Sequence, residues 1–364
     1  MHTTTSVSEL KTALEHVSRV STKHVTLPVL QCVLLEAADD SLIIRATNLE
    51  IGVEARLSAT TTTTGVVAVP AQTLLQTITL LNAATVDLRV DGGALMIDGS
   101  GSKTKITCVP HEEFPSIPKL TETGQTINNK LFTLGIKSTA FAASPSTIKP
   151  ELGSVYIFQK KEHSLTFVAT DSFRLMEKTV PQKGVVLEQG ILIPFKNALE
   201  IARLCEGQDT DPICRINENQ CSFEFASGLY VTTRLTTGSF PDYEQIIPKE
   251  YVTHTTVLKS DLEHAFKKSS IFLNRFFQVK LTVSEKELQV AADNGEVGTT
   301  TESVAVETEG DELALNFNQR YVAEALSHFV DDSITLHFAG IGRPMVMKGV
   351  SDQSARYLVM PMNK

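Results

Sequence analysis

The segment VATDSFRL, residues 168–175, places a carboxylic acid, a hydroxyl and a guanidinium within four positions. Asp171 and Ser172 are residue types of a Ser/His/Asp catalytic site. The chain has no G-x-S-x-G elbow, and no histidine stands in a comparable setting. Arg174 cannot supply the missing base, because a guanidinium stays protonated in proteins. An enzyme with a site at Asp171 and Ser172 therefore remains an alternative with little support.

Other motifs that could carry chemistry are weak. The segment DGSGSKTK, residues 98–105, lacks the G-x-x-x-x-G-K-[ST] spacing of a phosphate loop, and a strand follows it, so we expect a hairpin turn. Nine histidines are scattered without paired spacing. The five cysteines include no C-x-x-C. We expect no metal, no cofactor and reduced thiols in a cytosol.

The elements around VATDSFRL occur three times along the chain. SLIIRATN from Ser41, SLTFVATD from Ser164 and ELQVAADN from Glu287 are separated by 123 and 123 residues. A second set, starting at Val69, Ile193 and Phe317, is separated by 124 and 124 residues. Two independent patterns with one spacing indicate internal triplication.

Each copy has the same predicted order of elements. Helices are expected near residues 8–20, 129–142 and 259–273, and a second set over 69–82, 193–206 and 317–330. Pro70 and Pro194 suit the first turn of a helix. Alternating β-branched strands fill the remainder, with a hairpin turn at residues 91–93.

Proline-rich linkers separate the copies near residues 120 and 248. We therefore predict three domains of sheet plus two helices, at residues 1–122, 123–249 and 250–364. Asn48, Asp171 and Asn294 occupy one position in the three copies, where each ends a strand. Because Asn and Asp side chains bond the backbone two residues on, this position is expected to be a turn.

Charge and hydropathy limit the classes of function. The formal charge of −9 argues against a protein that coats nucleic acid with its whole surface. The six predicted helices carry +3, so the remainder carries −12. Ordinary solvated helix faces or one confined basic face would both give this pattern. No apolar run is long enough for a membrane helix, and the start does not look like a secretory signal.

The segment YLVMPMNK, residues 357–364, is apolar almost to the end of the sequence. A final edge strand packed on its own core would explain alternate residues. Methionine near a chain end is also a residue type that adapts to several partners.

TLPVL (26–30), VATDSFRL (168–175), GSFPDYEQIIP (238–248) and YLVMPM (357–362) closely resemble the bacterial DNA sliding clamp family, the beta subunit of DNA polymerase III. The resemblance spans essentially the whole chain. It implies an α+β fold of three tandem DNA-clamp domains, in which two crescent protomers close head to tail into a homodimeric ring. Such a ring encircles duplex DNA, slides without sequence preference and tethers the replicative polymerase.

In this family, partners dock a short linear peptide in a groove between the second and third domains. Ser172 and Phe173 stand where the family often has Gly and His or Tyr, and Gln245 replaces a frequent Arg. The sequence ends in Asn363 and Lys364, whereas members of the family usually end in a single Arg or in Arg-Leu. These departures bear on peptide preference. The resemblance implies that the groove in this chain is formed by Leu152, Thr170, Ser172, Phe173, Arg174, Leu175, Pro241, Gln245, Ile246, Leu358, Met360, Pro361 and Met362.

The resemblance also implies a seam that closes the ring and a basic inner face. By position, Ile106 would meet Ile271 and Phe272 of the other chain, although each could equally be a core contact within its own domain. A surface lysine is usually only solvated. The residues expected to face DNA are Lys23, His24, Lys149, Lys196 and Arg203.

We therefore expect a cytoplasmic processivity clamp without catalytic activity. Its expected partners are a second copy of the chain, double-stranded DNA, the replicative polymerase, the clamp loader and other replication and repair proteins. The alternatives are the enzyme considered above and an extracellular adhesive β-repeat protein.

Overall fold

The computed structural model describes residues 1–21 and 27–362. It divides into two compact units. Unit 1 comprises residues 1–133 and 200–235, and unit 2 comprises residues 134–199 and 236–364. The division passes through two helices of the second repeat, α3 (Asn129–Thr139) and α4 (Phe195–Glu206).

Unit 1 contains one antiparallel sheet that receives strands from two repeats. Its central path runs β8-β7-β6-β1-β4-β16-β15-β14-β9, and β2, β3 and β5 extend from it. Its strands are β1 (His2–Ser6), β2 (Cys32–Ala38), β3 (Ser41–Thr47), β4 (Ile51–Thr63), β5 (Gly65–Pro70), β6 (Thr85–Asp91), β7 (Ala94–Gly99), β8 (Ser102–Thr107), β9 (Gln125–Thr126), β14 (Ile213–Ile216), β15 (Gln220–Glu224) and β16 (Leu229–Arg234).

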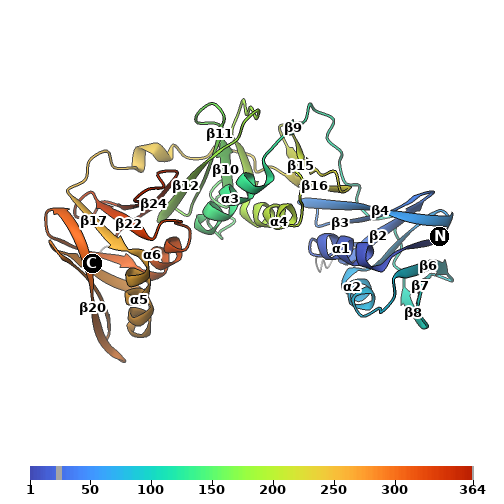
Figure 1. Ribbon diagram of the computed structural model, residues 1–364, viewed down its shortest axis with the longest axis horizontal. Helices are drawn as coiled ribbons and strands as arrows, with labels where there is room; N and C mark the ends of the chain where they lie inside the picture. Colours follow the sequence, from blue (N-terminus) through green and yellow to red (C-terminus); the bar gives the residue numbers. More distant parts are fainter. Residues whose placement is uncertain (22–26, 363–364) are drawn as a thin grey trace. The chain divides into compact units, whose positions relative to one another are not determined.

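Helices α1 (Val7–Val17) and α2 (Ala71–Thr79) lie side by side and pack on this sheet (Figure 1). Ser6 caps α1 by accepting a hydrogen bond from the backbone N–H of Glu9. Pro70 is the N-cap residue of α2, one position before the expected first turn. Proline suits the cap position for the same reason as the first turn: backbone N–H groups at the start of a helix have no partner within the helix, and proline has no N–H. A short 3₁₀ segment, η1 (Pro28–Gln31), precedes β2.

Unit 2 contains the second sheet, in the order β13-β10-β11-β12-β24-β23-β22-β17-β20-β19-β18-β21. Helices α5 (Lys259–Ser269) and α6 (Gln319–Leu326) contact each other and this sheet. Three 3₁₀ segments, η2 (Ala140–Ala142), η3 (Tyr243–Ile246) and η4 (Ser270–Phe272), lie in the same unit. Its strands are β10 (Ser154–Phe158), β11 (Ser164–Thr170), β12 (Arg174–Pro181), β13 (Ile191–Pro194), β17 (Thr253–Leu258), β18 (Gln278–Val283), β19 (Glu287–Asn294), β20 (Gly298–Gly310), β21 (Leu313–Asn318), β22 (Ser333–Phe338), β23 (Met345–Gly349) and β24 (Ala355–Val359).

The predicted α+β class and the six helices are present within the described residues. The expected hairpins also form. Gly92 and Gly93 have φ of 56° and 76° between β6 and β7, the left-handed pair that a tight hairpin turn requires. The segment DGSGSKTK, residues 98–105, forms the turn of the β7–β8 hairpin at Ser100 and Gly101, as expected.

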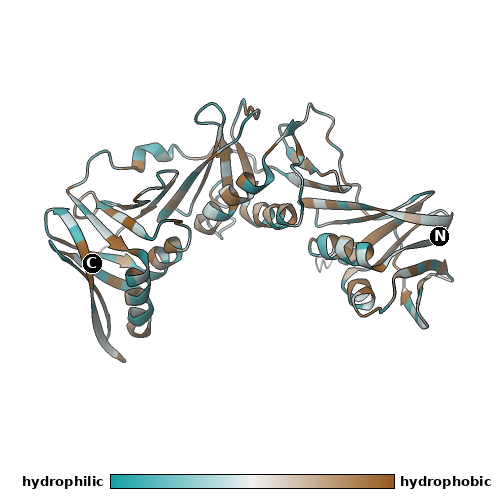
Figure 2. Cartoon of the chain, viewed as in Figure 1, coloured by the Kyte–Doolittle hydropathy of each residue, from teal (hydrophilic) through white to brown (hydrophobic). Residues whose placement is uncertain are grey.

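Apolar side chains from both helices and strands form the cores. Leu10, Leu14 and Val17 of α1 are fully buried. In the third repeat, Leu262 and Phe266 of α5 pack in one cluster with the inward side chains of β18, β19 and β22. Figure 2 shows polar residues dominating α5 while apolar residues recur along the strands. Burial of this apolar surface is the main favourable contribution to folding.

The final strand β24 is an interior strand, so the edge strand that was one of the two interpretations of the tail does not form. It pairs with β23 of its own repeat and with β12 of the second repeat. The equivalent join in unit 1 is the pairing of β16 with β4. Backbone ladders therefore connect consecutive repeats.

A histidine pair on β17 and β22 predicts a pH dependence. His254 and His337 are register partners with their Nδ1 atoms 2.7 Å apart. Burial, then His254 and Lys348, lowers the pKa of His337 from 6.5 to about 4. The unfolded chain therefore takes up this proton first as pH falls. The contribution of His337 to the free energy of unfolding is fully present above about pH 6.5. It is lost as the pH falls from about 6.5 to about 4, and the loss is on the order of 1–2 kcal/mol after solvent screening.

Urea unfolding of the wild type and of His337→Gln between pH 7.5 and 4 checks this expectation. The difference between the two stability curves isolates this histidine from the carboxylates. The variant should have a flatter profile. Parallel profiles over that range would show that His337 contributes nothing to it.

Candidate functional site

The corner between β11 and β12 contains the residues that first suggested chemistry. Thr170 Oγ1 donates to the carbonyl of Arg174 at 2.6 Å. Asp171 Oδ1 accepts hydrogen bonds from the backbone N–H groups of Phe173 and Arg174 at 2.9 and 3.0 Å. Both side chains thus fix the turn, and the interpretation of Asp171 as a strand-end turn residue is confirmed.

The corner between β3 and β4 has the same hydrogen bonds. Thr47 Oγ1 donates to the carbonyl of Ile51 at 2.9 Å, and Asn48 Oδ1 accepts from the N–H groups of Glu50 and Ile51 at 3.0 and 2.9 Å. In the third repeat, Asn294 accepts from the N–H of Glu296 at 3.1 Å. We call residues 47–52 the first corner and residues 170–175 the second corner.

One residue of each corner has a left-handed backbone. Ser172 has φ of 78°, and Leu49, one repeat earlier, has φ of 76°. This conformation costs a non-glycine residue roughly 1–2 kcal/mol, whereas glycine adopts it freely.

We expect Ser172→Gly to raise the free energy of unfolding by about 0.5–1 kcal/mol, the relief of strain less the greater backbone entropy of glycine. Thermal unfolding measures this as a rise of about 1–4 °C. Ser172→Ala is the matched control, since it removes the hydroxyl and keeps the strain. Equal melting temperatures for the glycine and alanine variants would contradict the argument.

Arg174 connects the second corner to the third repeat. Its guanidinium donates to Asp171 Oδ2 at 3.0 Å, to Glu324 Oε2 at 2.6 Å and to the carbonyl of Phe141 at 2.8 Å. It also lies over the ring of Tyr321, 4.6 Å from the centroid. The side chain is only 10% exposed. Most of Arg174 is therefore committed to holding α6 and η2 against the corner.

The last described residues follow the second corner and then leave it. Leu175 pairs with Leu358 in the β12–β24 ladder. The N–H of Met360 donates to the carbonyl of Phe173 at 2.8 Å, and the N–H of Met362 donates to the carbonyl of Asn316 on β21 at 2.8 Å. The tail thus runs from β12 to the third repeat.

The linker between the second and third repeats is fixed beside this tail. The hydroxyl of Tyr243 donates to the carboxylate of Glu177 on β12, and Lys160 pairs with Glu244. Burial and then the contact with Glu177 raise the pKa of Tyr243. Tyr243 shares one apolar cluster with Leu175 and Leu358.

The residues assigned to the groove by resemblance separate into two sets. Leu175 and Leu358 are fully buried, and Leu152 and Thr170 are 6% exposed, so these four support the surface from beneath. Phe173 is 61% exposed and Ile246 48% exposed. Ser172, Pro241 and Gln245 are exposed as well, and Gln245 donates to Asp242 Oδ2 at 2.7 Å. We call Phe173, Ile246 and the half-buried Met360, Pro361 and Met362 the second-corner patch.

Comparison with known proteins gives the family. Models of the N-terminal, central and C-terminal domains of the DNA polymerase III beta subunit match residues 1–118, 126–242 and 244–363. The chain belongs to the DNA polymerase III beta subunit family. The beta sliding clamp of Escherichia coli strain K12 is 26% identical over 341 residues, 93% of each chain. That of Caulobacter vibrioides is 28% identical over 361 residues, 96% of each chain.

Solved structures of the family have the same fold. The DNA polymerase III beta subunit of Thermotoga maritima has 23% sequence identity and a TM-score of 0.94, with 100% of both chains covered. A sliding clamp of Pseudomonas aeruginosa, solved bound to griselimycin, has 25% identity and a TM-score of 0.93, again over 100% of both chains.

Some residues near the second-corner patch of this beta-subunit family member were not found from the sequence. Val346 of β23 pairs with Leu358, and Ile247 packs on the same cluster. Tyr321 of α6 faces the guanidinium of Arg174. These contacts depend on pairing between distant segments. Only the short apolar run of residues 345–347 is a local signal of a buried strand.

The residues that the family resemblance assigns to DNA have different surroundings. Lys149 and Lys196 are exposed. Arg203 donates through Nε to Glu200 Oε2 at 3.1 Å, so part of its charge is offset. Lys23 and His24 lie outside the described residues.

The residues assigned to the ring seam also differ. Ile106 is 5% exposed, so it packs in the core of its own domain, which was the alternative for this residue. Ile271 is 66% exposed and Phe272 is half-buried in η4. β8, which carries Ile106, lies at the edge of its sheet and offers unpaired backbone groups to another strand.

Two further observations concern metal ligation and membrane-spanning helices. Among residues 1–21 and 27–362, no three His, Cys, Asp or Glu side chains are arranged to hold a metal ion. In the same part of the chain, no helix combines the length and apolarity required to span a bilayer.

Proposed function

We propose that this protein is a processivity clamp of the replicative DNA polymerase. Two copies would close head to tail into a ring around duplex DNA, and the ring would slide because its contacts with phosphates are few and carry no sequence information. The observation that carries the proposal is the match of three beta-subunit domain models, in order, across the chain.

The chemistry of the chain supports a ring that surrounds DNA without gripping it. The net charge is −9, which disfavours DNA binding over the whole surface. The inner wall of the ring is proposed to present basic residues to DNA. These are Lys149, Lys196 and Arg203, together with Lys23 and His24, which lie outside the described residues. β8 and the exposed Ile271 are proposed to form the seam between protomers, with Phe272 beside it and Ile106 supporting β8 from within.

The second-corner patch is proposed as the docking site for short linear peptides of the polymerase, the clamp loader and other replication and repair proteins. A few exposed apolar anchors on a fixed backbone suit this role, because such anchors carry most of the energy of an interface. The protein would act in the cytoplasm without catalysing a reaction. The commitment of Asp171 to the turn weighs against the alternative of an enzyme at that position.

The decisive experiment measures topological retention. The protein is loaded onto a nicked circular plasmid by the clamp loader of the same bacterium, and the complex is passed through a gel-filtration column. We expect the protein to stay with circular DNA and to leave after a restriction enzyme linearises the plasmid. Equal release from circular and linear DNA would overturn the proposal, and light scattering at micromolar concentration should show a dimer.

A further inference from the structure

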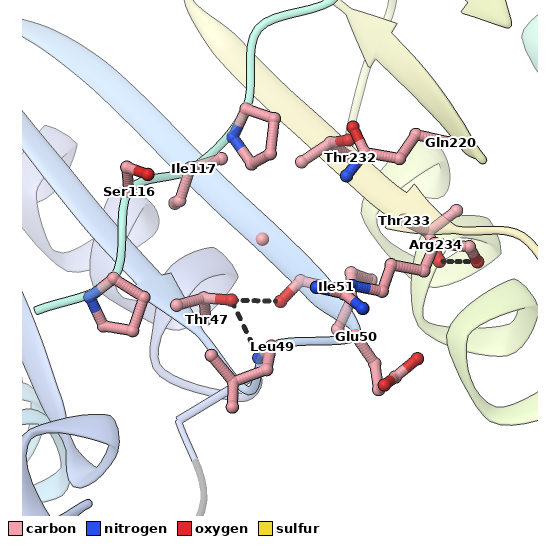
Figure 3. A pocket seen from close by; sticks show the side chains of 13 residues that line it. Thr47, Leu49, Glu50, Ile51, Ser116, Ile117, Gln220, Thr232, Thr233 and Arg234 are labelled. Carbon is pink, nitrogen blue, oxygen red and sulfur yellow. Dashed lines mark hydrogen bonds between the residues drawn. The ribbon is translucent and has the colours of Figure 1, made fainter. Parts of the chain in front are cut away.

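A pocket lies at the first corner. It has a volume of about 280 Å³, near the lower end of ligand pockets, and is lined by the first corner, the linker at residues 115–118 and strands β15 and β16 (Figure 3). All of these segments belong to unit 1.

The two corners share one backbone arrangement. The N–H of Arg234 donates to the carbonyl of Glu50 at 2.8 Å, just as the N–H of Met360 donates to the carbonyl of Phe173. One step along each ladder, Gly52 pairs with Thr232 where the second corner pairs Leu175 with Leu358. On the partner strand, Thr232 and Arg234 therefore stand where the second corner has Leu358 and Met360.

The linker forms a fixed wall of the pocket. Ile117 lies over Gly52 so closely that an added Cβ would be 2.9 Å from Cγ2 of Ile117. Lys119 donates to Glu54 Oε1 at 2.8 Å and lies 3.6 Å from the centroid of the Tyr230 ring. The hydroxyl of Tyr230 donates to the carbonyl of Pro118 at 3.0 Å. A wall held in this way needs little rearrangement on binding.

The floor of the pocket offers hydrogen-bond donors. Gln220 and Arg234 are register partners, so their side chains lie on one face of the sheet. Arg234 is exposed, and its guanidinium has no carboxylate within 4.0 Å among the described residues. Thr232, on the same face, is 4% exposed, and its Oγ1 has no hydrogen-bond partner in the described part of the chain. Leaving a buried hydroxyl unbonded costs about 1–3 kcal/mol.

We propose that this pocket binds a short peptide segment of a partner protein in which an aliphatic side chain is adjacent to one carboxylate. The aliphatic group would pack between Leu49, which is 39% exposed, and Ile117. The carboxylate would accept hydrogen bonds from Arg234, with Gln220 and Thr232 as further donors. Glu50, an exposed residue that also lines the pocket, disfavours a second acid.

This inference does not depend on the proposed function, since it uses only the local chemistry of unit 1. The probes are two matched peptides, acetyl-Pro-Leu-Asp-amide and acetyl-Pro-Leu-Asn-amide, which differ in one charge. Binding to the full-length protein is followed by amide chemical shifts in two-dimensional NMR spectra.

We expect the Asp peptide to shift the amides of residues 49–52 and 232–234 saturably, with a dissociation constant of roughly 1 mM or below. Arg234→Gln should weaken it at least about tenfold, and Thr232→Val about threefold. Arg234 is exposed, so its variant should fold normally. Phe173→Ala, at the other corner, should bind the peptide like the wild type.

Four outcomes would overturn the inference: no saturable binding to the wild type, equal binding of the Asp and Asn peptides, unchanged binding by Arg234→Gln, or loss of binding in Phe173→Ala. The last outcome would place the peptide on the second-corner patch. Failure of these peptides would leave retention on circular DNA unchanged, so the two proposals fail separately.

Discussion

Replacing Arg174 with Leu is expected to lower the free energy of unfolding of unit 2 by about 3–5 kcal/mol, because breaking a buried ion pair leaves an unpaired charge. Asp171, whose side chain is 9% exposed, would lose the guanidinium, and so would Glu324 and the carbonyl of Phe141. The stacking on Tyr321 would also be lost. This is the largest stability effect that we expect from one surface-adjacent residue.

Urea unfolding followed by circular dichroism measures the effect as a shift of the midpoint. Lys268→Met is the matched control. It breaks the 2.8 Å contact with Glu302, in which the lysine side chain is 50% exposed, and exposed pairs contribute only about 0–1 kcal/mol. A shift for Arg174→Leu no larger than that of the control would show that the guanidinium contributes no more than an ordinary surface charge.

The second large effect concerns the second-corner patch. Phe173→Ala combined with Met360→Ala should weaken binding of the polymerase of the same bacterium by roughly 100-fold, because two apolar anchors are removed. The main chain at this position is held by the hydrogen bond between the N–H of Met360 and the carbonyl of Phe173. Truncating both side chains should therefore leave the fold intact.

Surface plasmon resonance with immobilised polymerase gives the affinity, and gel filtration gives the oligomeric state. Ile341→Ala removes another exposed apolar side chain of unit 2, one that is 87% exposed, and should bind polymerase like the wild type. Removing residues 360–364 should have at least the effect of the double variant. Wild-type affinity in the double variant would exclude this patch as the docking site.

The sequence predicted those features that depend on local chemistry. The recurrence of Asn48, Asp171 and Asn294 indicated strand-end turns, and each side chain accepts hydrogen bonds from backbone groups two residues on. Asn, Asp and glycine favour turns through their own local chemistry, so the hairpin turn at Gly92 and Gly93 could also be predicted.

Features that depend on pairing between distant segments were not predictable in this way. Periodicity did not show that β24 lies between β12 and β23, and an edge strand fitted the sequence of the tail equally well. Alternation also did not reveal which face of β8 is buried, so Ile106 could not be assigned to core or surface. The contacts of Arg174 with Glu324 span 150 positions, a separation at which no local pattern operates.

Consecutive repeats are fastened through peptide groups, in the ladders β4–β16 and β12–β24. Because these ladders consist of backbone hydrogen bonds, they depend little on the identity of the side chains. Evolution could therefore keep glycine and threonine at one joint and paired leucines at the other while the joints themselves stayed intact. Duplication of a single module in this way yields adjoining surfaces that can acquire different affinities independently.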